Sequence, residues 1–117
     1  MKTQIIRLGD RIRKIRAEEL HLMMDSKVIF TLIDARDTKE FGKEHIPGAV
    51  SLPSDRLAKN VLVQRRKSET FVTYCTDLQC DESARAAKKL ERYGFKNVLE
   101  LRGGLEDWKK AGFPTER

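Results

Sequence analysis

Two cysteines lie five positions apart where an apolar run gives way to an expected helix. The apolar run contains Phe71, Val72 and Tyr74 and stops at Cys75, and Cys80 follows in the next stretch of the chain. Loop amides and the positive end of a helix dipole stabilise a thiolate and lower the pKa of a thiol. The same groups would hold an anionic substrate or sulfur adduct. This arrangement predicts covalent catalysis by a cysteine nucleophile.

Each thiol also has an alternative role. Cys75 could be a small apolar residue that completes a buried strand, because free cysteine is frequently buried. Cys80 could resolve a reacted Cys75 by forming a disulfide with it, or it could be a neutral loop residue. Spacing alone does not decide whether the two sulfur atoms meet. We expect no metal site, because His21 and His45 lack zinc-ligand spacing with the cysteines.

Strand and helix patterns alternate along the chain. Apolar runs without two-residue alternation are typical of strands buried on both faces of a parallel sheet, and they lie at 28–36, 70–75 and 97–102. Shorter strands are expected at the start of the segment 14–27 and at 49–52. Helices are expected within 14–27, 38–45, 54–67, 83–94 and 105–112, with Ser54 as the cap of the third.

This alternation predicts an α/β domain at 13–117, with a mainly parallel sheet covered by helices on both faces, and an N-terminal arm at 1–12. Ligand sites in such sheets lie beyond the carboxyl ends of the strands. Three segments are therefore expected to meet at one edge: 34–36, Cys75 with its loop, and 102–104.

The composition is that of a soluble globular protein, with 39% hydrophobic and 36% charged residues. The net charge is +6, and basic clusters lie at 11–16, 64–67 and 88–92. Acidic residues are interspersed with them and no nucleic-acid motif is visible, so we interpret these clusters as solvated faces rather than a nucleic-acid interface. No apolar stretch could cross a membrane, and the N-terminus lacks the apolar region of a signal peptide. We expect a cytoplasmic protein without a membrane partner.

Three segments resemble, in order and spacing, the signatures of the rhodanese-like domains. They are LIDARDTKEFGKEHIPGAVSLP, FVTYC followed by SARAAKKL, and LRGGLEDWKKAGFP. The resemblance covers roughly 13–115. It implies a three-layer sandwich with a central parallel sheet of about five strands. It also implies a cofactor-free sulfurtransferase, in which Cys75 accepts sulfane sulfur as a persulfide and passes it to an acceptor.

The resemblance also implies roles for other residues. The substrate-binding loop would consist of Thr76, Asp77, Leu78, Gln79, Cys80 and Asp81. Asp34 and Arg36 match positions that support the site from beneath, where we expect a structural salt bridge. Arg102 could lean toward the site. His45 matches a turn-stabilising position, so we do not expect it to act as a catalytic base.

The cysteine loop departs from the usual sulfurtransferase pattern, Cys-x-x-Gly-x-Arg. Here the run is CTDLQCDES, with Leu78 in place of the glycine, no arginine, and carboxylates at Asp77, Asp81 and Glu82. An arginine at this position would pair with a doubly charged donor. Carboxylates near the sulfur oppose both a thiolate and a bound anion unless their side chains point outward or cap the helix. Asp81 or Ser83 could provide such a cap. We therefore expect thiosulfate to be a poor donor. The related phosphatase pattern, Cys-x5-Arg, also fails, because its arginine position holds Asp81.

Three hypotheses follow from the sequence. The first is a sulfurtransferase or persulfide carrier that uses a small sulfur donor and a thiol acceptor. The second is a thiol-redox protein that cycles a disulfide between Cys75 and Cys80. The third is a non-catalytic interaction module with a protein partner.

Overall fold

The computed structural model of the protein describes residues 12–117. The N-terminal arm expected at 1–12 lies outside this range except for Ile12, which is buried in the core. Within the described residues, no helix is both long enough and apolar enough to span a membrane.

All five strands of the central sheet run parallel, in the order β1-β5-β4-β2-β3. The strands are β1 (Arg13–Ile15), β2 (Thr31–Asp34), β3 (Val50–Ser51), β4 (Thr70–Tyr74) and β5 (Asn97–Leu101). β4 occupies the centre and is almost entirely buried, since it pairs with β2 on one side and β5 on the other. The sheet confirms the prediction of an α/β fold.

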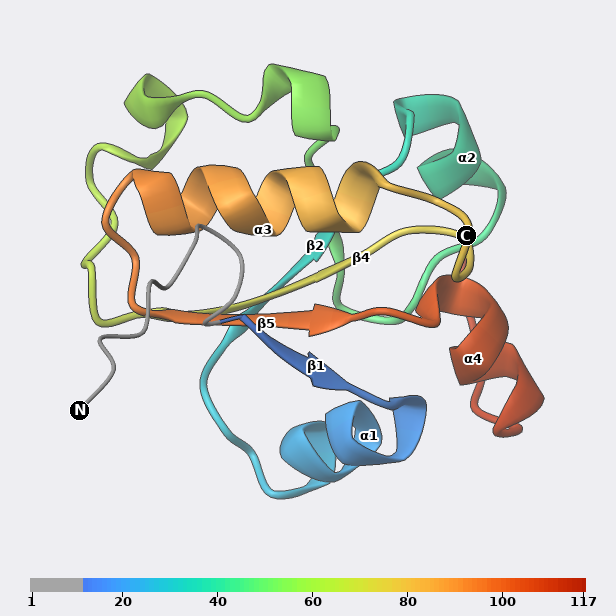
Figure 1. Ribbon diagram of the computed structural model, residues 1–117. Helices are drawn as coiled ribbons and strands as arrows, with labels where there is room; N and C mark the ends of the chain where they lie inside the picture. The colour runs from blue at the N-terminus through green and yellow to red at the C-terminus, as the bar shows by residue number, and fades with distance from the viewer. Residues whose placement is uncertain (1–11) are drawn as a thin grey trace, which may run out of the picture.

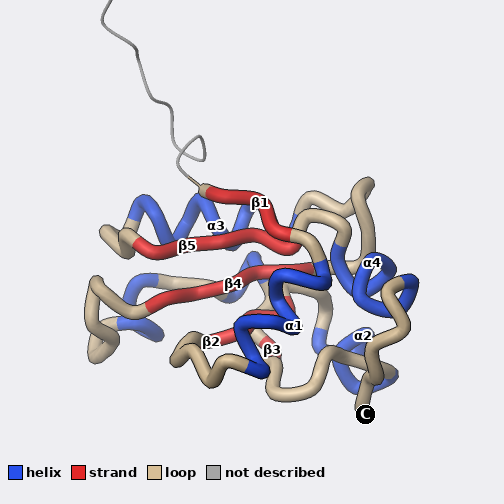
Figure 2. Tube along the Cα trace, turned by 90° about the horizontal axis from the view of Figure 1, so that it is seen from below, coloured by secondary structure: helices blue, strands red, loops and turns tan. Residues whose placement is uncertain are grey.

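Helices cover both faces of the sheet, as Figures 1 and 2 show. The helices are α1 (Ala17–Asp25), α2 (Thr38–Lys43), α3 (Glu82–Arg92) and α4 (Gly104–Lys110), with two 3-10 turns, η1 (Ser54–Arg56) and η2 (Lys59–Leu62). One core cluster joins α3 and the 3-10 turns to the sheet through Leu57, Ala86 and Leu90. The other joins α1 and α4 to the opposite face through Leu20 and Trp108.

The strand predicted at 28–36 is shorter in the structure, where β2 begins at Thr31. Val28 and Ile29 are exposed, by 46% and 93%. The backbone N–H of Val28 donates to the carbonyl of Met23 at the end of α1, so this part of the apolar run closes the helix instead of entering the sheet.

The α-helix predicted at 54–67 is wrong, because the segment forms only the turns η1 and η2. Leu57 and Leu62 are both buried. In a continuous α-helix they would point about 140° apart, whereas extended residues between the turns allow both to reach the core. Ser54 does not cap a helix; its hydroxyl donates to the carboxylate of Glu82.

Candidate functional site

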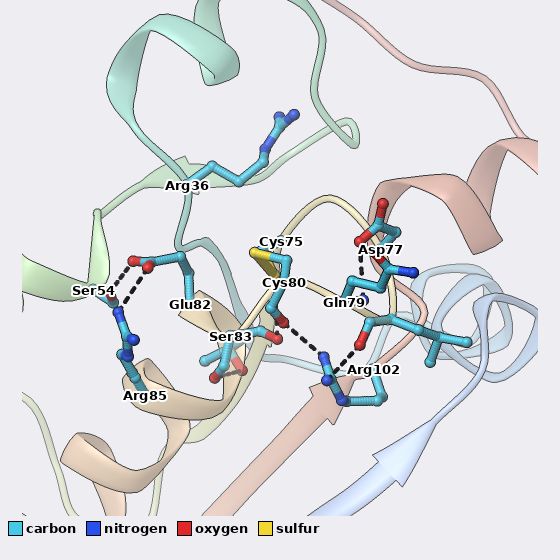
Figure 3. Close-up of a disulfide and its surroundings, with 12 residues drawn as sticks. Arg36, Ser54, Cys75, Asp77, Gln79, Cys80, Glu82, Ser83, Arg85 and Arg102 are labelled. Carbon is cyan, nitrogen blue, oxygen red and sulfur yellow. Dashed lines mark hydrogen bonds and ion pairs between the residues drawn. A yellow bond between two sulfur atoms is a disulfide. The ribbon is translucent and has the colours of Figure 1, made fainter.

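The two cysteines are joined by a disulfide at the carboxyl edge of the sheet. Cys75 follows β4 directly and is fully buried. Cys80 is half-buried and lies near the start of α3. Their Cα atoms are 6.3 Å apart, within the range that disulfides require. Figure 3 shows the bond between Cys75 and Cys80, which closes the intervening loop 76–79. The structure therefore holds this site in its oxidised form.

Arg102, at the end of β5, holds the far part of the cysteine loop. Its guanidinium donates to the carbonyl of Cys80 at 2.8 Å and to that of Leu78 at 2.5 Å. Figure 3 shows both bonds reaching the loop from the β5 side. Arg102 therefore binds the loop backbone, and the same guanidinium lies 3.9 Å from the buried carboxylate of Glu100.

The start of α4 holds the near part of the loop. The backbone N–H of Leu105 donates to the carbonyl of Cys75 at 2.8 Å, and that of Glu106 donates to the carbonyl of Thr76 at 2.9 Å. Gly104 makes this approach possible, because its φ is +65° and a Cβ there would lie 2.7 Å from the carbonyl carbon of Thr76. The double-glycine turn thus positions the backbone on which Cys75 sits.

Asp77 organises the loop from within. Its carboxylate accepts from the backbone N–H of Gln79 at 3.0 Å, and its carbonyl accepts from that of Cys80 at 3.2 Å. In the disulfide form, these two amides are therefore bonded within the loop and do not contribute to an anion cradle. Asp81 occupies the N-cap position of α3 without a side-chain cap bond.

A buried polar pair lies beneath Cys75, and the sequence analysis did not identify it. The hydroxyl of Ser83 donates to the carboxylate of Glu100 at 2.6 Å, and the sulfur of Cys75 lies 3.6 Å from that hydroxyl oxygen. Both side chains are buried, Glu100 being only 2% exposed. Ser83 therefore does not cap α3. A charged residue within an apolar strand was the available signal, because a buried carboxylate requires a partner.

We expect Ser83→Ala to lower the free energy of unfolding by about 2 kcal/mol, because it removes the hydroxyl that hydrogen-bonds a buried carboxylate. The matched control is Ser51→Ala, since the hydroxyl of Ser51 is buried without a partner among the described residues. Its removal should be neutral or slightly stabilising. Urea denaturation of both variants checks this, and equal losses would contradict it.

Asp34 and Arg36 form the salt bridge that was expected beneath the site. Both are buried, and the guanidinium donates to the carboxylate at 2.7 and 3.0 Å and to the carbonyl of Glu44 at 2.6 Å. Burial acts to lower the pKa of Arg36, but the hydrogen bond and charge of Asp34 outweigh it, so the pKa is raised. The pair ties β2 to the segment after α2.

Tyr74 connects this pair to the central strand. Its hydroxyl donates to the Asp34 carboxylate at 2.7 Å and accepts from the backbone N–H of Ile46 at 3.1 Å. Burial, and then the adjacent carboxylate, raise the pKa of Tyr74, so the hydroxyl remains a donor. Tyr74, the residue before Cys75, is therefore held both by its side-chain hydrogen bonds and by the backbone pairing of β4.

His45 is placed away from this chemistry. Its backbone pairs with Glu116 near the C-terminus, its ring stacks on Phe41, and its Nδ1 lies 2.8 Å from the carbonyl of Phe41. These contacts are those of a structural residue. Among residues 12–117, no cluster of three or more His, Cys, Asp or Glu side chains could hold a metal ion.

A pocket of about 640 Å³ opens beside the disulfide. Cys80 and Thr76 line it, together with charged side chains from η1, α3, α2 and the two residues before α2: Arg36, Asp37, Glu40, Asp55, Arg56, Glu82, Arg85 and Lys89. Several of its cations already have partners. Arg36 pairs with Asp34, Arg85 with Glu82, and Lys89 donates to the carbonyl of Ser54. A small molecule could reach Cys80 from this pocket.

Comparison with known proteins agrees with this fold. An uncharacterized protein of Synechocystis is 40% identical over 72% of this chain and 45% of its own length. The Mycobacterium tuberculosis protein named "Probable adenylyltransferase/sulfurtransferase MoeZ" is 34% identical over 86% of this chain and 25% of its own. The solved rhodanese-like domain of the Anabaena protein Alr3790 is 31% identical, with a TM-score of 0.77, over 88% of this chain and 77% of that one.

The chain spans 45%, 51% and 37% of the length of three of its curated relatives, so the activities of those whole proteins do not transfer to it directly. The profile of the family described as "Rhodanese-like domain" matches residues 16–111. That match includes every strand from β2 to β5 and all four α-helices. The protein belongs to the family of rhodanese-like domains.

Proposed function

We propose that the reduced protein is a sulfurtransferase in which Cys75 carries sulfane sulfur. The Cys75 thiolate attacks the outer sulfur of a persulfide donor, R–S–SH, and R–S⁻ leaves, so that Cys75–S–SH forms. An acceptor thiolate then takes the outer sulfur and restores the Cys75 thiolate. The position of Cys75 at the end of the central strand carries this proposal, because α4 fixes its backbone beside a pocket.

The disulfide must open before this reaction can occur. Two thiols reduce it, forming one disulfide between themselves and leaving Cys75 and Cys80 as thiols. A cytoplasmic setting would supply such thiols, and we propose that the protein acts there. The sulfurtransferase name carried by the Mycobacterium tuberculosis relative supports the same reaction class.

The test compares two single cysteine variants. Reduced wild-type protein is incubated with glutathione persulfide, and peptide mapping locates the added sulfur. We expect one sulfur atom on Cys75, none in Cys75→Ser, and nearly unchanged loading in Cys80→Ser. Loading that survives the loss of Cys75 would contradict the proposal.

Thiosulfate should load the protein far more slowly than glutathione persulfide. Three of the four pocket cations, Arg36, Arg85 and Lys89, already have partners, and four carboxylates line the same pocket, so a doubly charged oxyanion would find little compensating charge beyond that of Arg56. Equal loading by the two donors would contradict this expectation.

A second candidate is a thiol-redox protein, which the Cys75–Cys80 disulfide favours. In that function, reduced protein would pass two electrons to an oxidant and return to the disulfide form. The same variants separate the candidates, because Cys80→Ser abolishes a disulfide cycle but leaves sulfur loading intact.

A further inference from the structure

The disulfide presents its two sulfur-bearing residues unequally to solvent. Cys75 is fully buried, whereas Cys80 is half-buried and lines the pocket of about 640 Å³. A nucleophile opens a disulfide by attacking the sulfur that it can reach, and the other sulfur leaves as a thiolate. A small nucleophile entering this pocket therefore attacks Cys80 and expels Cys75.

The surroundings of Cys75 suit it to be the leaving group. Its sulfur lies 3.6 Å from the hydroxyl oxygen of Ser83. That hydroxyl donates to Glu100 in the oxidised form. Because a hydroxyl can rotate, it can instead donate to a thiolate that forms beside it. The carboxylate of Glu100 then keeps the guanidinium of Arg102, 3.9 Å away, as its partner. The departing sulfur thus acquires a hydrogen-bond donor without any movement of the backbone.

The loop keeps the two sulfur atoms close after the bond opens. Arg102 binds the carbonyls of Leu78 and Cys80, and the N–H of Cys80 donates to the carbonyl of Asp77. None of these bonds involves a sulfur atom, so all of them are available to the opened form. Cys80 therefore remains in position to exchange sulfur with Cys75.

The charges of the pocket favour a small nucleophile with a low charge. Three of its four cations, Arg36, Arg85 and Lys89, have partners, which leaves Arg56, and four carboxylates, among them those of Asp55 and Glu82, also line it. A bulky, doubly charged oxyanion would meet these carboxylates with little compensation. Hydrosulfide has one sulfur atom and a single negative charge, and its conjugate acid, hydrogen sulfide, is neutral. It is therefore a nucleophile of the size and charge that this pocket favours.

We propose that the oxidised protein takes up inorganic sulfide. HS⁻ attacks the sulfur of Cys80, the bond between the cysteines breaks, and its electron pair leaves on Cys75. The products are Cys80–S–SH and the Cys75 thiolate. The disulfide is the oxidant in this step: the sulfide sulfur is oxidised to the sulfane level while Cys75 is reduced, so no other oxidant takes part.

The sulfur then passes to Cys75, a second step that rests on the proposed function. The Cys75 thiolate attacks the outer sulfur of the Cys80 persulfide, whose S–S bond breaks. Cys80 leaves as a thiolate, and Cys75–S–SH is formed with the proton that hydrosulfide brought. The protein would in this way begin a sulfur-transfer cycle from sulfide.

The experiment adds about one equivalent of sodium sulfide to the oxidised protein without oxygen, and traps the products with an alkylating agent at successive times. We expect one added sulfur atom per chain, with about a tenfold excess on Cys80 over Cys75 at the earliest time, because reaction follows access to the sulfur. The label should move to Cys75 later. Sulfur found first on Cys75, or opening of the disulfide with no sulfur retained, would overturn the proposal.

Two controls complete the design. Pre-reduced wild-type protein and Cys75→Ala both lack the disulfide, so neither should gain sulfur from sulfide. Glutathione persulfide with reduced wild-type protein is run in parallel. If glutathione persulfide loads the reduced protein but sulfide does not load the oxidised protein, sulfide uptake is overturned and the proposed function is not. If sulfide adds to Cys80 but glutathione persulfide does not load Cys75, the proposed function is overturned and the attack of sulfide on Cys80 is not.

Discussion

Replacing Gly104 with alanine should lower the free energy of unfolding by about 2–5 kcal/mol and slow sulfur loading of Cys75 by about tenfold or more. The residue has a φ of +65°, which costs about 1–2 kcal/mol for an alanine. The new methyl group would also lie 2.7 Å from the carbonyl carbon of Thr76. Backbone atoms cannot rotate away from it, so the cysteine loop or α4 must shift.

Variants of two other glycines separate the cost of the positive φ from the cost of the close approach to the cysteine loop. Gly112 has a φ of +87° with nothing within 4 Å of the added methyl group, so Gly112→Ala should lose only about 1–2 kcal/mol and leave sulfur loading intact. Gly42 lies inside α2 with nothing within 4 Å, and Gly42→Ala should be neutral or stabilising. Urea denaturation and persulfide loading measure both effects. Equal behaviour of Gly104→Ala and Gly112→Ala would show that the close approach to the loop is unimportant.

The parts of the site that the sequence predicted are those set by strand ends. Apolar runs that are buried on both faces identify parallel strands, and parallel strands end at one edge. This reasoning brought 34–36, Cys75 and 102–104 together, and the structure places all of them at that edge. The salt bridge between Asp34 and Arg36 was expected from the resemblance to the rhodanese-like domains, and the structure contains it.

The parts that the sequence did not predict depend on three-dimensional pairing. Ser83 and Glu100 are separated by 17 positions along the chain and meet only because α3 packs over β5. Arg102 was expected near the site, but its hydrogen bonds go to two backbone carbonyls, which carry no sequence signal, and its charge also lies 3.9 Å from the carboxylate of Glu100. The helix predicted at 54–67 is wrong because apolar residues at helical spacing do not reveal that Leu57 and Leu62 reach the core from an extended segment and from η2.

Replacing Asp34 with alanine should lower the free energy of unfolding by about 3–5 kcal/mol, because it leaves a buried guanidinium without its carboxylate. Arg36 is only 5% exposed, and Tyr74 would lose the acceptor of its hydroxyl in the same change. The double variant Asp34→Ala/Arg36→Met should recover part of the loss, since it removes the unpaired charge.

Asp37 supplies the control for this loss, because its exposed carboxylate accepts from the N–H of Lys39 at the start of α2. Asp37→Ala should therefore lower the free energy of unfolding by only about 0.5–2 kcal/mol. Urea denaturation of the three variants decides the matter. If Asp34→Ala were no worse than Asp37→Ala, or if the double variant were less stable than Asp34→Ala, the buried pair would not be what holds the end of β2 against Tyr74. In that case the position of Cys75, one residue further along β4, would depend on α4 and Arg102 alone.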